Sequence, residues 1–379
     1  MKVIRVGIIG QGRSGWGIHG DYLKDDPRFK VVAVADAIES RRHFAEVHLG
    51  CEAVADYRDL LARKDLDLVV NSSFSYLHVP ISLAALRAGH HVLSEKPLAP
   101  SVRDVDALMA AAKKADRTLA VYQQSRYAPY FRKVQEVIRS GVLGRIVQVS
   151  IQFNGFSRRW DWQTLTSFAG GNLMNTGPHP LDQALILFGE GMPEVKCWME
   201  CTKEGSFGDA ENHVKLLLSG PGHPVIDVEI SSCCAYPCFL YNVYGTRGGL
   251  KATAFDAEWK YFKPSEAPKQ KLLREPLADA NGRPIYGSEP LVWHTGKWAE
   301  SDDAPQGAAY SSAAAPTQGG MTGSYYSMLY KALTRGAKLE ITVEQVRRQI
   351  AVIQEAHRQN PHIRKPTGKK RVVSSSRRG

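Results

Sequence analysis

The first fifteen residues contain the feature that most constrains the fold. An apolar run of strand length, Val3 to Gly10, leads directly into Gly10-Gln-Gly12-Arg-Ser-Gly15. In such a turn the first glycine allows the sharp bend, the second lets the backbone approach a pyrophosphate, and the third lets the next helix pack closely. A second apolar run, Phe29 to Asp36, ends in an acid about twenty residues further on, where a ribose-binding carboxylate belongs. The pattern predicts a dinucleotide-binding β-α-β unit.

The β-α alternation continues over the next hundred residues. Alternating strands and helices favour a doubly wound parallel sheet, that is, an α/β Rossmann domain, which we expect over residues 1–122. The expected strands after the first two are near Ala53 and at 66–71, 89–95 and 118–122, and the expected helices are at 39–49, 76–88 and 101–115.

The second half of the chain changes character. Later strand-like runs follow one another with few helices between them, which indicates one large, mostly antiparallel open sheet in an α+β domain over residues 123–360. The expected strands are 145–153, 194–201, 211–219, 224–233, 239–246 and 258–262, and the expected helices are 128–140, 178–188, 322–335 and 343–359. Residues 264–316 are rich in proline, so we expect an irregular insertion there.

The net charge of +11 belongs mostly to the end of the chain. Residues 358–379 carry eight Lys or Arg and no acid, so the rest carries 11 − 8 = +3. We therefore interpret residues 361–379 as a basic tail and expect no nucleic-acid partner. No stretch resembles a membrane span or a signal peptide, and we expect a cytoplasmic protein. The six cysteines lack zinc-ligand spacing, so we expect no metal site.

Two further stretches contain candidate catalytic groups. The strand expected at 89–95 ends in Glu95-Lys96-Pro97. Ligands of parallel sheets lie beyond the carboxyl ends of strands, so Lys96 is placed to meet one, although a surface salt bridge with Glu95 is the simpler alternative. The second stretch has Pro178 as the first residue of a helix and His179 behind it. Taken alone, His179 could be an ordinary histidine at a helix start.

The order of these motifs resembles the Gfo/Idh/MocA oxidoreductases, the family of glucose-fructose oxidoreductase and inositol dehydrogenase. The resemblance runs from Val3 to about Gly189 and more loosely beyond. It rests on Gly10-x-Gly12-x-x-Gly15, Asp36, Ala85-Leu-x-Ala-Gly89-x-His91-Val-Leu-x-Glu95-Lys96-Pro97 and Asn175-x-Gly177-x-His179-x-x-Asp182.

The resemblance implies roles at the matching positions. Lys96 and His179 would be the catalytic pair, and NAD, with NADP as an alternative, would be the cofactor. The cofactor-binding residues would be Gly10, Gly12, Arg13, Ser14 and Gly15 at the pyrophosphate, Asp36 with Arg41 nearby at the ribose, Ser73, His78, Glu95 and Lys96 on the nicotinamide side, and Gln124. The chain departs from the family pattern at Ser73-Phe74-Ser75, Gln124 and Asn175.

A substrate-binding group is also expected. An Arg fork and flat indoles suit sugar rings and carboxylates, which favours Arg159, Trp160 and Trp162 as a substrate wall, although core or interface packing is the alternative. Asn175 is neutral and can both donate and accept, so we expect it to position substrate. The remaining expected substrate-binding residues are Asp182 and Tyr127.

The leading hypothesis is an NAD(P)-dependent oxidoreductase that transfers hydride between nicotinamide and a secondary hydroxyl of a sugar, sugar acid or cyclic polyol. One alternative is a redox-neutral, NAD-dependent glycoside hydrolase or epimerase-like enzyme of the same superfamily. The other is a non-enzymatic cofactor-binding regulator. A large sheet with few helices needs cover on its outer face, so we also expect a homodimer or homotetramer.

Overall fold

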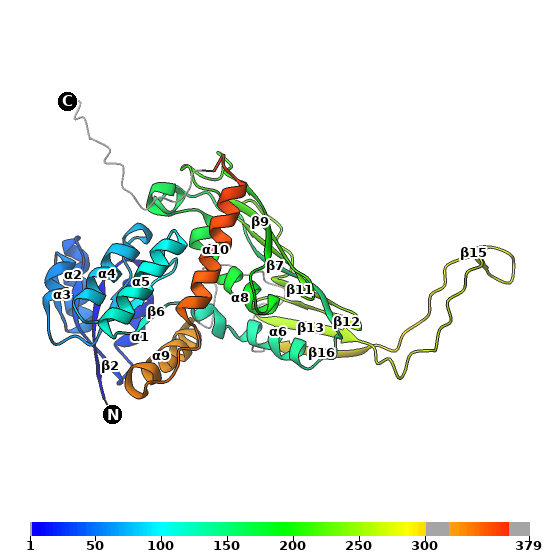
Figure 1. Ribbon diagram of the computed structural model, residues 1–379, viewed down its shortest axis with the longest axis horizontal. Coiled ribbons are helices and arrows are strands. Elements are labelled where there is room, and N and C mark those ends of the chain that lie inside the picture. The colour runs from blue at the N-terminus through cyan, green and yellow to red at the C-terminus, as the bar shows by residue number, and fades with distance from the viewer. Residues whose placement is uncertain (1, 301–317, 364–379) are drawn as a thin grey trace.

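The computed structural model describes residues 2–300 and 318–363 (Figure 1). Its first half is a six-stranded sheet in the order β3-β2-β1-β4-β5-β6, and all neighbouring strands are parallel. The strands are β1 Ile4–Ile9, β2 Phe29–Ala35, β3 Glu52–Val54, β4 Leu68–Asn71, β5 His91–Ser94 and β6 Leu119–Val121. This confirms the predicted Rossmann sheet. The strand order reverses between β1 and β4, which is where ligands bind in such sheets.

The helices of this half cover both faces of the sheet, so its central strands are almost wholly buried and almost wholly apolar. They are α1 Asp21–Leu23, α2 Glu39–Leu49, α3 Tyr57–Ala62, α4 His78–Arg87 and α5 Val102–Ala115. Ser101 begins α5 by accepting a hydrogen bond from the backbone N–H of Asp104, as its position before the apolar repeat indicates.

The second half contains an eight-stranded sheet in the order β16-β13-β12-β11-β7-β10-β9-β8. Only β7 and β10 run parallel, so the sheet is mostly antiparallel, as predicted. The strands are β7 Ile146–Asn154, β8 Glu194–Glu200, β9 His213–Ser219, β10 Val225–Ser231, β11 Tyr241–Gly245, β12 Gly248–Ala252, β13 Asp256–Tyr261 and β16 His294–Ala299. Burial alternates strictly along β8, which shows that one face is packed and the other is open.

Most helices of the second half contact this sheet. The helix α8, Pro178–Phe188, contacts β7 and β10, and α6, Pro129–Arg139, contacts β12 and β13. A single turn, α7 Asn172–Asn175, precedes α8 and contacts β9 and β10. The last helix, α10 Val343–Gln359, starts at the predicted capping box of Thr342 and Gln345.

Two strands of the sheet were not expected. β12 begins at Gly248-Gly249, which reads as a turn in the sequence but forms the second strand of a tight hairpin with β11. β16 falls inside the insertion that we expected to be irregular. It is an edge strand paired on one side only, with β13, so its sequence carries no continuous apolar run to reveal it.

The remainder of the insertion projects from this edge. Figure 1 shows the chain between β13 and β16 extending away from the rest of the protein, with the short strands β14, Leu277–Ala278, and β15, Pro284–Ile285, near its tip. Residues 301–316 of the insertion and most of the expected basic tail lie outside the described residues. Within the described ranges, no helix is long and apolar enough to cross a membrane.

The helix α9, Gln318–Arg335, binds the Rossmann half through buried hydroxyl groups. Tyr325 donates to the carbonyl oxygen of Val121 at 2.7 Å, and the hydroxyl of Tyr326 lies 2.8 Å from His19 Nδ1. These contacts tie α9 to the Rossmann half. The domain boundary that we expect at residue 122 stays a prediction.

The contact between Tyr326 and His19 should contribute measurably to stability. Tyr326→Phe removes the hydroxyl and leaves a buried ring nitrogen without that partner, which should cost about 1–3 kcal/mol of unfolding free energy. Urea unfolding followed by fluorescence measures the change. Tyr286→Phe is the matched control, because Tyr286 is 96% exposed and should lose nothing. Equal unfolding free energies of the two variants would contradict a stabilising role for the contact between Tyr326 and His19.

Candidate functional site

The glycine turn lies at the carboxyl end of β1 and has the shape expected of a phosphate cradle. A Cβ atom at Gly15 would lie 1.7 Å from the carbonyl oxygen of Gly10, so only glycine lets the following turn pack this closely. At Gly12, by contrast, the nearest heavy atom to such a Cβ is Arg41 Nη1 at 3.9 Å. The backbone at Gly12 is therefore open to an approaching group.

Asp36 lies beside this turn, just beyond the carboxyl end of β2. Its Oδ2 atom accepts a hydrogen bond from the backbone N–H of Gln11 at 2.7 Å, which fixes the carboxylate next to the cradle. Arg41 Nη1 is 3.6 Å from the same oxygen. The site thus places a carboxylate and a guanidinium together where the adenosine ribose of a dinucleotide would bind.

Several buried polar groups around the cradle have no hydrogen-bond partner among the described residues. They are both side-chain polar atoms of Gln11 and the hydroxyl of Ser72, and Oε1 of Gln124, which follows β6, also has none. Buried polar atoms without partners are rare because each costs free energy, so such a group indicates a polar ligand or water at this place. These residues fit a dinucleotide lying across the ends of β1 and β4.

Lys96 is held by its side chain at Asn175 and by its backbone at Glu95. Its Nζ atom donates to the carbonyl oxygen of Asn175 at 2.8 Å, and its backbone N–H donates to Glu95 Oε2 at 3.1 Å. Burial lowers the pKa of Lys96, and the negative charge of Glu95 opposes this effect. Glu95 itself is only 5% exposed, so the alternative of a surface salt bridge does not describe this pair.

Glu95 stays ionised although it is buried. Burial alone would raise its pKa, but contact with His19 and the charges of His19 and Lys96 outweigh this and lower the pKa to about 2. His19 Nε2 lies 3.3 Å from Glu95 Oε1. Tyr326 contacts the other nitrogen of His19, so α9 helps to hold His19 and, through it, Glu95 in place.

His179 occupies the start of α8 and faces the same region. Its Nδ1 atom lies 3.0 Å from the hydroxyl oxygen of Ser125. Burial, followed by the positive charges of Lys96 and Arg13, lowers the pKa of His179 to about 3. The imidazole is therefore neutral at physiological pH, and the charges of Lys96 and Arg13 act on it directly.

His78 supports the loops around Lys96. Its Nδ1 and Nε2 atoms lie 2.7 Å and 3.1 Å from the carbonyl oxygens of Pro97 and Ser73. The ring is buried, and burial lowers its pKa. The hydroxyl of Ser73 donates to Asn71 Oδ1 at 2.7 Å. The expected contact of Ser73 and His78 with the nicotinamide stays a prediction, and the structure gives His78 a bracing position between two loops.

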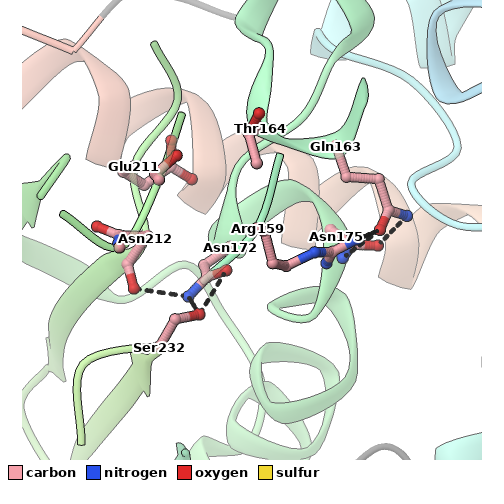
Figure 2. A pocket seen from close by; sticks show the side chains of 10 residues that line it. Arg159, Gln163, Thr164, Asn172, Asn175, Glu211, Asn212 and Ser232 are labelled. Atoms are coloured by element: carbon pink, nitrogen blue, oxygen red, sulfur yellow. Dashed lines mark hydrogen bonds between the residues drawn. The ribbon is translucent and has the colours of Figure 1, made fainter. Parts of the chain in front are cut away.

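The expected substrate wall is only partly assembled. Arg159 pairs with Asp161 and donates to Gln163. Gln163 Nε2 in turn donates to Asn175 Oδ1 at 2.8 Å, so Arg159 reaches Asn175 through one intervening side chain (Figure 2).

The two indoles of the expected wall lie differently from one another. Trp162 packs edge-on against Phe74, with ring centroids 5.0 Å apart, whereas Trp160 is 78% exposed. Trp162 therefore lies next to the loop that follows β4, and Trp160 contributes no fixed surface in this structure.

Asp182 and Tyr127 are engaged elsewhere. Arg126 binds both carboxylate oxygens of Asp182, with its Nε atom 2.9 Å from Oδ2, and the hydroxyl of Tyr127 donates to Glu340 at 2.9 Å. Both side chains link α8 and its neighbours to the segment before α10. Substrate binding by these two residues stays a prediction, and packing accounts for their positions.

A polar pocket adjoins Asn175 and contains residues that the sequence did not suggest. Figure 2 shows Glu211 and Asn212 on one side of it and Gln163 and Asn175 on the other. Burial raises the pKa of Glu211 to about 7. Glu211 and Ser125, like His19 beneath Glu95, lie far in sequence from their partners and belong to no recognisable motif, so no sequence signal could have identified them.

Comparison with known proteins agrees with this geometry. Residues 4–123 match the family model of the Gfo/Idh/MocA oxidoreductases with an NAD-binding Rossmann fold, and residues 131–251 match the C-terminal domain of the same family. Myo-inositol 2-dehydrogenase of Thermotoga maritima is 29% identical over 256 residues, which cover 66% of this chain and 75% of that protein. The NADP-dependent scyllo-inositol 2-dehydrogenase IolW of Bacillus subtilis is 29% identical over 199 residues, covering 52% and 54%.

A solved structure supports the fold over nearly the whole chain. GenD2 from gentamicin A biosynthesis, in complex with NAD, superposes with a TM-score of 0.73 at 20% identity and covers 95% of both chains. The two family models together match more than half of the chain. This chain is a member of the Gfo/Idh/MocA family of NAD-binding oxidoreductases.

Proposed function

We propose that this protein is an NAD(P)-dependent dehydrogenase that oxidises a secondary hydroxyl of a cyclic polyol, sugar or sugar acid. The observation that carries the proposal is that Lys96 and His179 lie near the dinucleotide cradle and close enough for the charge of Lys96 to help lower the pKa of His179. Two relatives that are named as inositol dehydrogenases support a polyhydroxylated ring as the substrate.

The two side chains suit the two halves of an alcohol oxidation. The bound nicotinamide supplies the hydride acceptor, and the hydroxyl proton needs a base. His179 is neutral at working pH and can take this proton; a proton on Nδ1, donated to Ser125, would leave Nε2 as the basic atom. Lys96 would hold the same substrate oxygen as a hydrogen-bond donor and stabilise its developing negative charge.

The surroundings support this division of roles. Glu95 is ionised and fixed, so it favours the ammonium form of Lys96 despite burial. The charge of Lys96 in turn favours the neutral form of His179. The pair thus combines a neutral imidazole that can accept a proton with an amino group that can donate a hydrogen bond to the same oxygen.

A substrate panel tests the proposal. The purified protein is incubated with NAD or NADP and with inositols, hexoses and uronic acids, and the absorbance of reduced nicotinamide is followed. We expect net reduction with at least one member. Consumption of a glycoside or epimerisation of a sugar without net reduction would favour a redox-neutral enzyme, and cofactor binding without any turnover would favour a regulator.

Asp36 should decide the choice between NAD and NADP. Asp36 can accept a hydrogen bond from a ribose 2′-hydroxyl and would repel a 2′-phosphate, so kcat/KM should be higher with NAD than with NADP. Asp36→Asn removes the repulsion and leaves Arg41 free to pair with a phosphate. The ratio should then fall by at least about tenfold, equivalent to ~1.4 kcal/mol. A wild-type ratio in favour of NADP would refute the preference.

Loss of either proposed catalytic side chain should slow turnover. Lys96→Ala and His179→Ala should fold normally and each lose about 10² to 10⁴ in kcat, as expected for loss of a general base or a charge-stabilising donor. Lys297→Ala and His43→Ala are matched controls because both side chains are 78% exposed. Wild-type kcat in His179→Ala would show that the base lies elsewhere.

The pH dependence of kcat/KM should report the lowered pKa of His179. A histidine with a lowered pKa is neutral down to acidic pH, so the acidic limb of kcat/KM should lie well below the 6.5 of a free imidazole, toward the value of about 3 for His179. Activity should therefore not fall as the pH drops from 7 to 6. An acidic limb near 6.5 in the free enzyme would contradict the buried, neutral His179.

We also propose assembly through the open face of the eight-stranded sheet. Trp198 on β8 is 57% exposed on this face, and Lys215, Asp227 and Glu229 form an ion-pair network beside it. Light scattering at micromolar concentration should give a dimer or tetramer, and Trp198→Glu should lower the mass. Val47→Glu is the control on exposed α2. A wild-type monomer would refute the assembly.

A further inference from the structure

Glu211 supplies the acceptors for the start of the single turn α7. It lies between β8 and β9 and is only 2% exposed. Its backbone carbonyl oxygen accepts from the N–H of Asn172, and its Oε1 atom accepts from the N–H of Leu173, both at 2.9 Å. The first N–H groups of a helical turn have no partner within the turn, so these two bonds fix its position.

The chain opposite Glu211 is shaped to receive the carboxylate. Gly171 has a φ of +107°, and a Cβ atom there would lie 2.4 Å from both carboxylate oxygens. Any other residue at 171 would displace Glu211 or the turn. The close approach of the carboxylate and the backbone therefore depends on glycine at this position.

The other end of α7 holds Lys96. The N–H of Asn175 donates to the carbonyl oxygen of Gly171 at 2.8 Å, and the carbonyl oxygen of Asn175 accepts from Lys96 Nζ at 2.8 Å. The Asn175 side chain is fixed separately by Gln163. A shift of the turn would therefore move the acceptor of the Lys96 ammonium group.

Few charged side chains lie around Glu211. Its Oε2 atom has no hydrogen-bond partner within the described part of the chain. Arg159 lines the same pocket, and the thiols of Cys197 and Cys201 lie near enough for the charge of Glu211 to contribute to their raised pKa values, behind the larger effect of burial. The other side chains of the pocket close to the carboxylate, Asn172, Asn212 and Ser232, are neutral. The carboxylate is thus committed to the turn and not to an ion pair.

We propose that Glu211 is a positioning residue for Lys96: through α7 it keeps the carbonyl oxygen of Asn175 at the place where it accepts the Lys96 ammonium group. The proposal rests on the proposed function only in so far as Lys96 is catalytic. Without Glu211, the turn loses an acceptor for its first N–H groups and the ammonium group loses a fixed partner. Lys96 then gives up its proton more readily, because the charge of Glu95 alone is left to oppose the effect of burial.

Competitive labelling tests this without substrate or cofactor. Lys96 is acetylated with trace acetic anhydride between pH 6 and 11, and its labelling is read by mass spectrometry against an internal standard. In Glu211→Ala the titration midpoint of Lys96 should fall by about one pH unit, a roughly tenfold faster labelling near neutral pH. Glu211→Gln should restore the wild-type midpoint, because its amide oxygen can still accept from the N–H of Leu173.

Two further variants complete the experiment. Glu211→Asp keeps a carboxylate but withdraws its oxygens by one methylene, so the titration midpoint of Lys96 should shift part of the way. This variant replaces Glu211→Ala if the alanine variant unfolds. Glu204→Gln, at an exposed position in the same loop, should behave as wild type. An unchanged Lys96 midpoint in folded Glu211→Ala or Glu211→Asp overturns the proposal.

Turnover separates this proposal from the proposed function. On the best substrate of the panel, kcat should fall in Glu211→Ala with KM little changed, and Glu211→Gln should recover it. A shifted Lys96 midpoint without any loss of kcat would support the positioning role and count against Lys96 as a catalytic residue. An unchanged midpoint together with lost turnover would leave the proposed function standing and overturn the role of Glu211.

Discussion

The hydrogen bond from the ammonium group of Lys96 to the carbonyl oxygen of Asn175 is the interaction on which the rest of the site depends. A charge away from water is costly unless it is compensated, and the ammonium group of Lys96 donates to the carbonyl oxygen of Asn175 while the nearby negative charge of Glu95 opposes the effect of burial. Lys96 follows β5 of the Rossmann sheet, and Asn175 ends the turn before α8. Satisfying this one charge therefore fixes the two halves of the protein against each other at the place where a substrate would react.

The supporting contacts extend in both directions from Lys96. On one side, His19 contacts Glu95 and is itself held by Tyr326 of α9, so a late helix of the chain helps to place a residue of the Rossmann half. On the other side, Glu211 and Gly171 hold α7. Groups fixed in this way need little reorganisation when charge develops on a bound oxygen, and such preorganisation is a major source of catalytic power.

The sequence predicted the parts of the molecule that depend on local patterns. The glycine turn and Asp36 belong to short motifs, the parallel sheet follows from the alternation of strands and helices, and the structure confirms the sheet. β12 and β16 were missed, because a glycine pair resembles a turn and an edge strand carries no continuous apolar run. His19, Ser125 and Glu211 could not be predicted, since their importance comes from partners more than thirty residues away, while Asp182 and Tyr127 have the family spacing but bind Arg126 and Glu340 here.

Transfer of deuterium is the most direct test of the central claim that hydride leaves a secondary carbinol carbon of a polyhydroxylated ring. The best substrate of the panel is prepared with deuterium on its ring carbinol carbons and incubated with the enzyme and NAD, and the mass of the reduced cofactor is measured. A single added deuterium on each reduced nicotinamide is the result that the account predicts. Product formed without deuterium on the nicotinamide would contradict it.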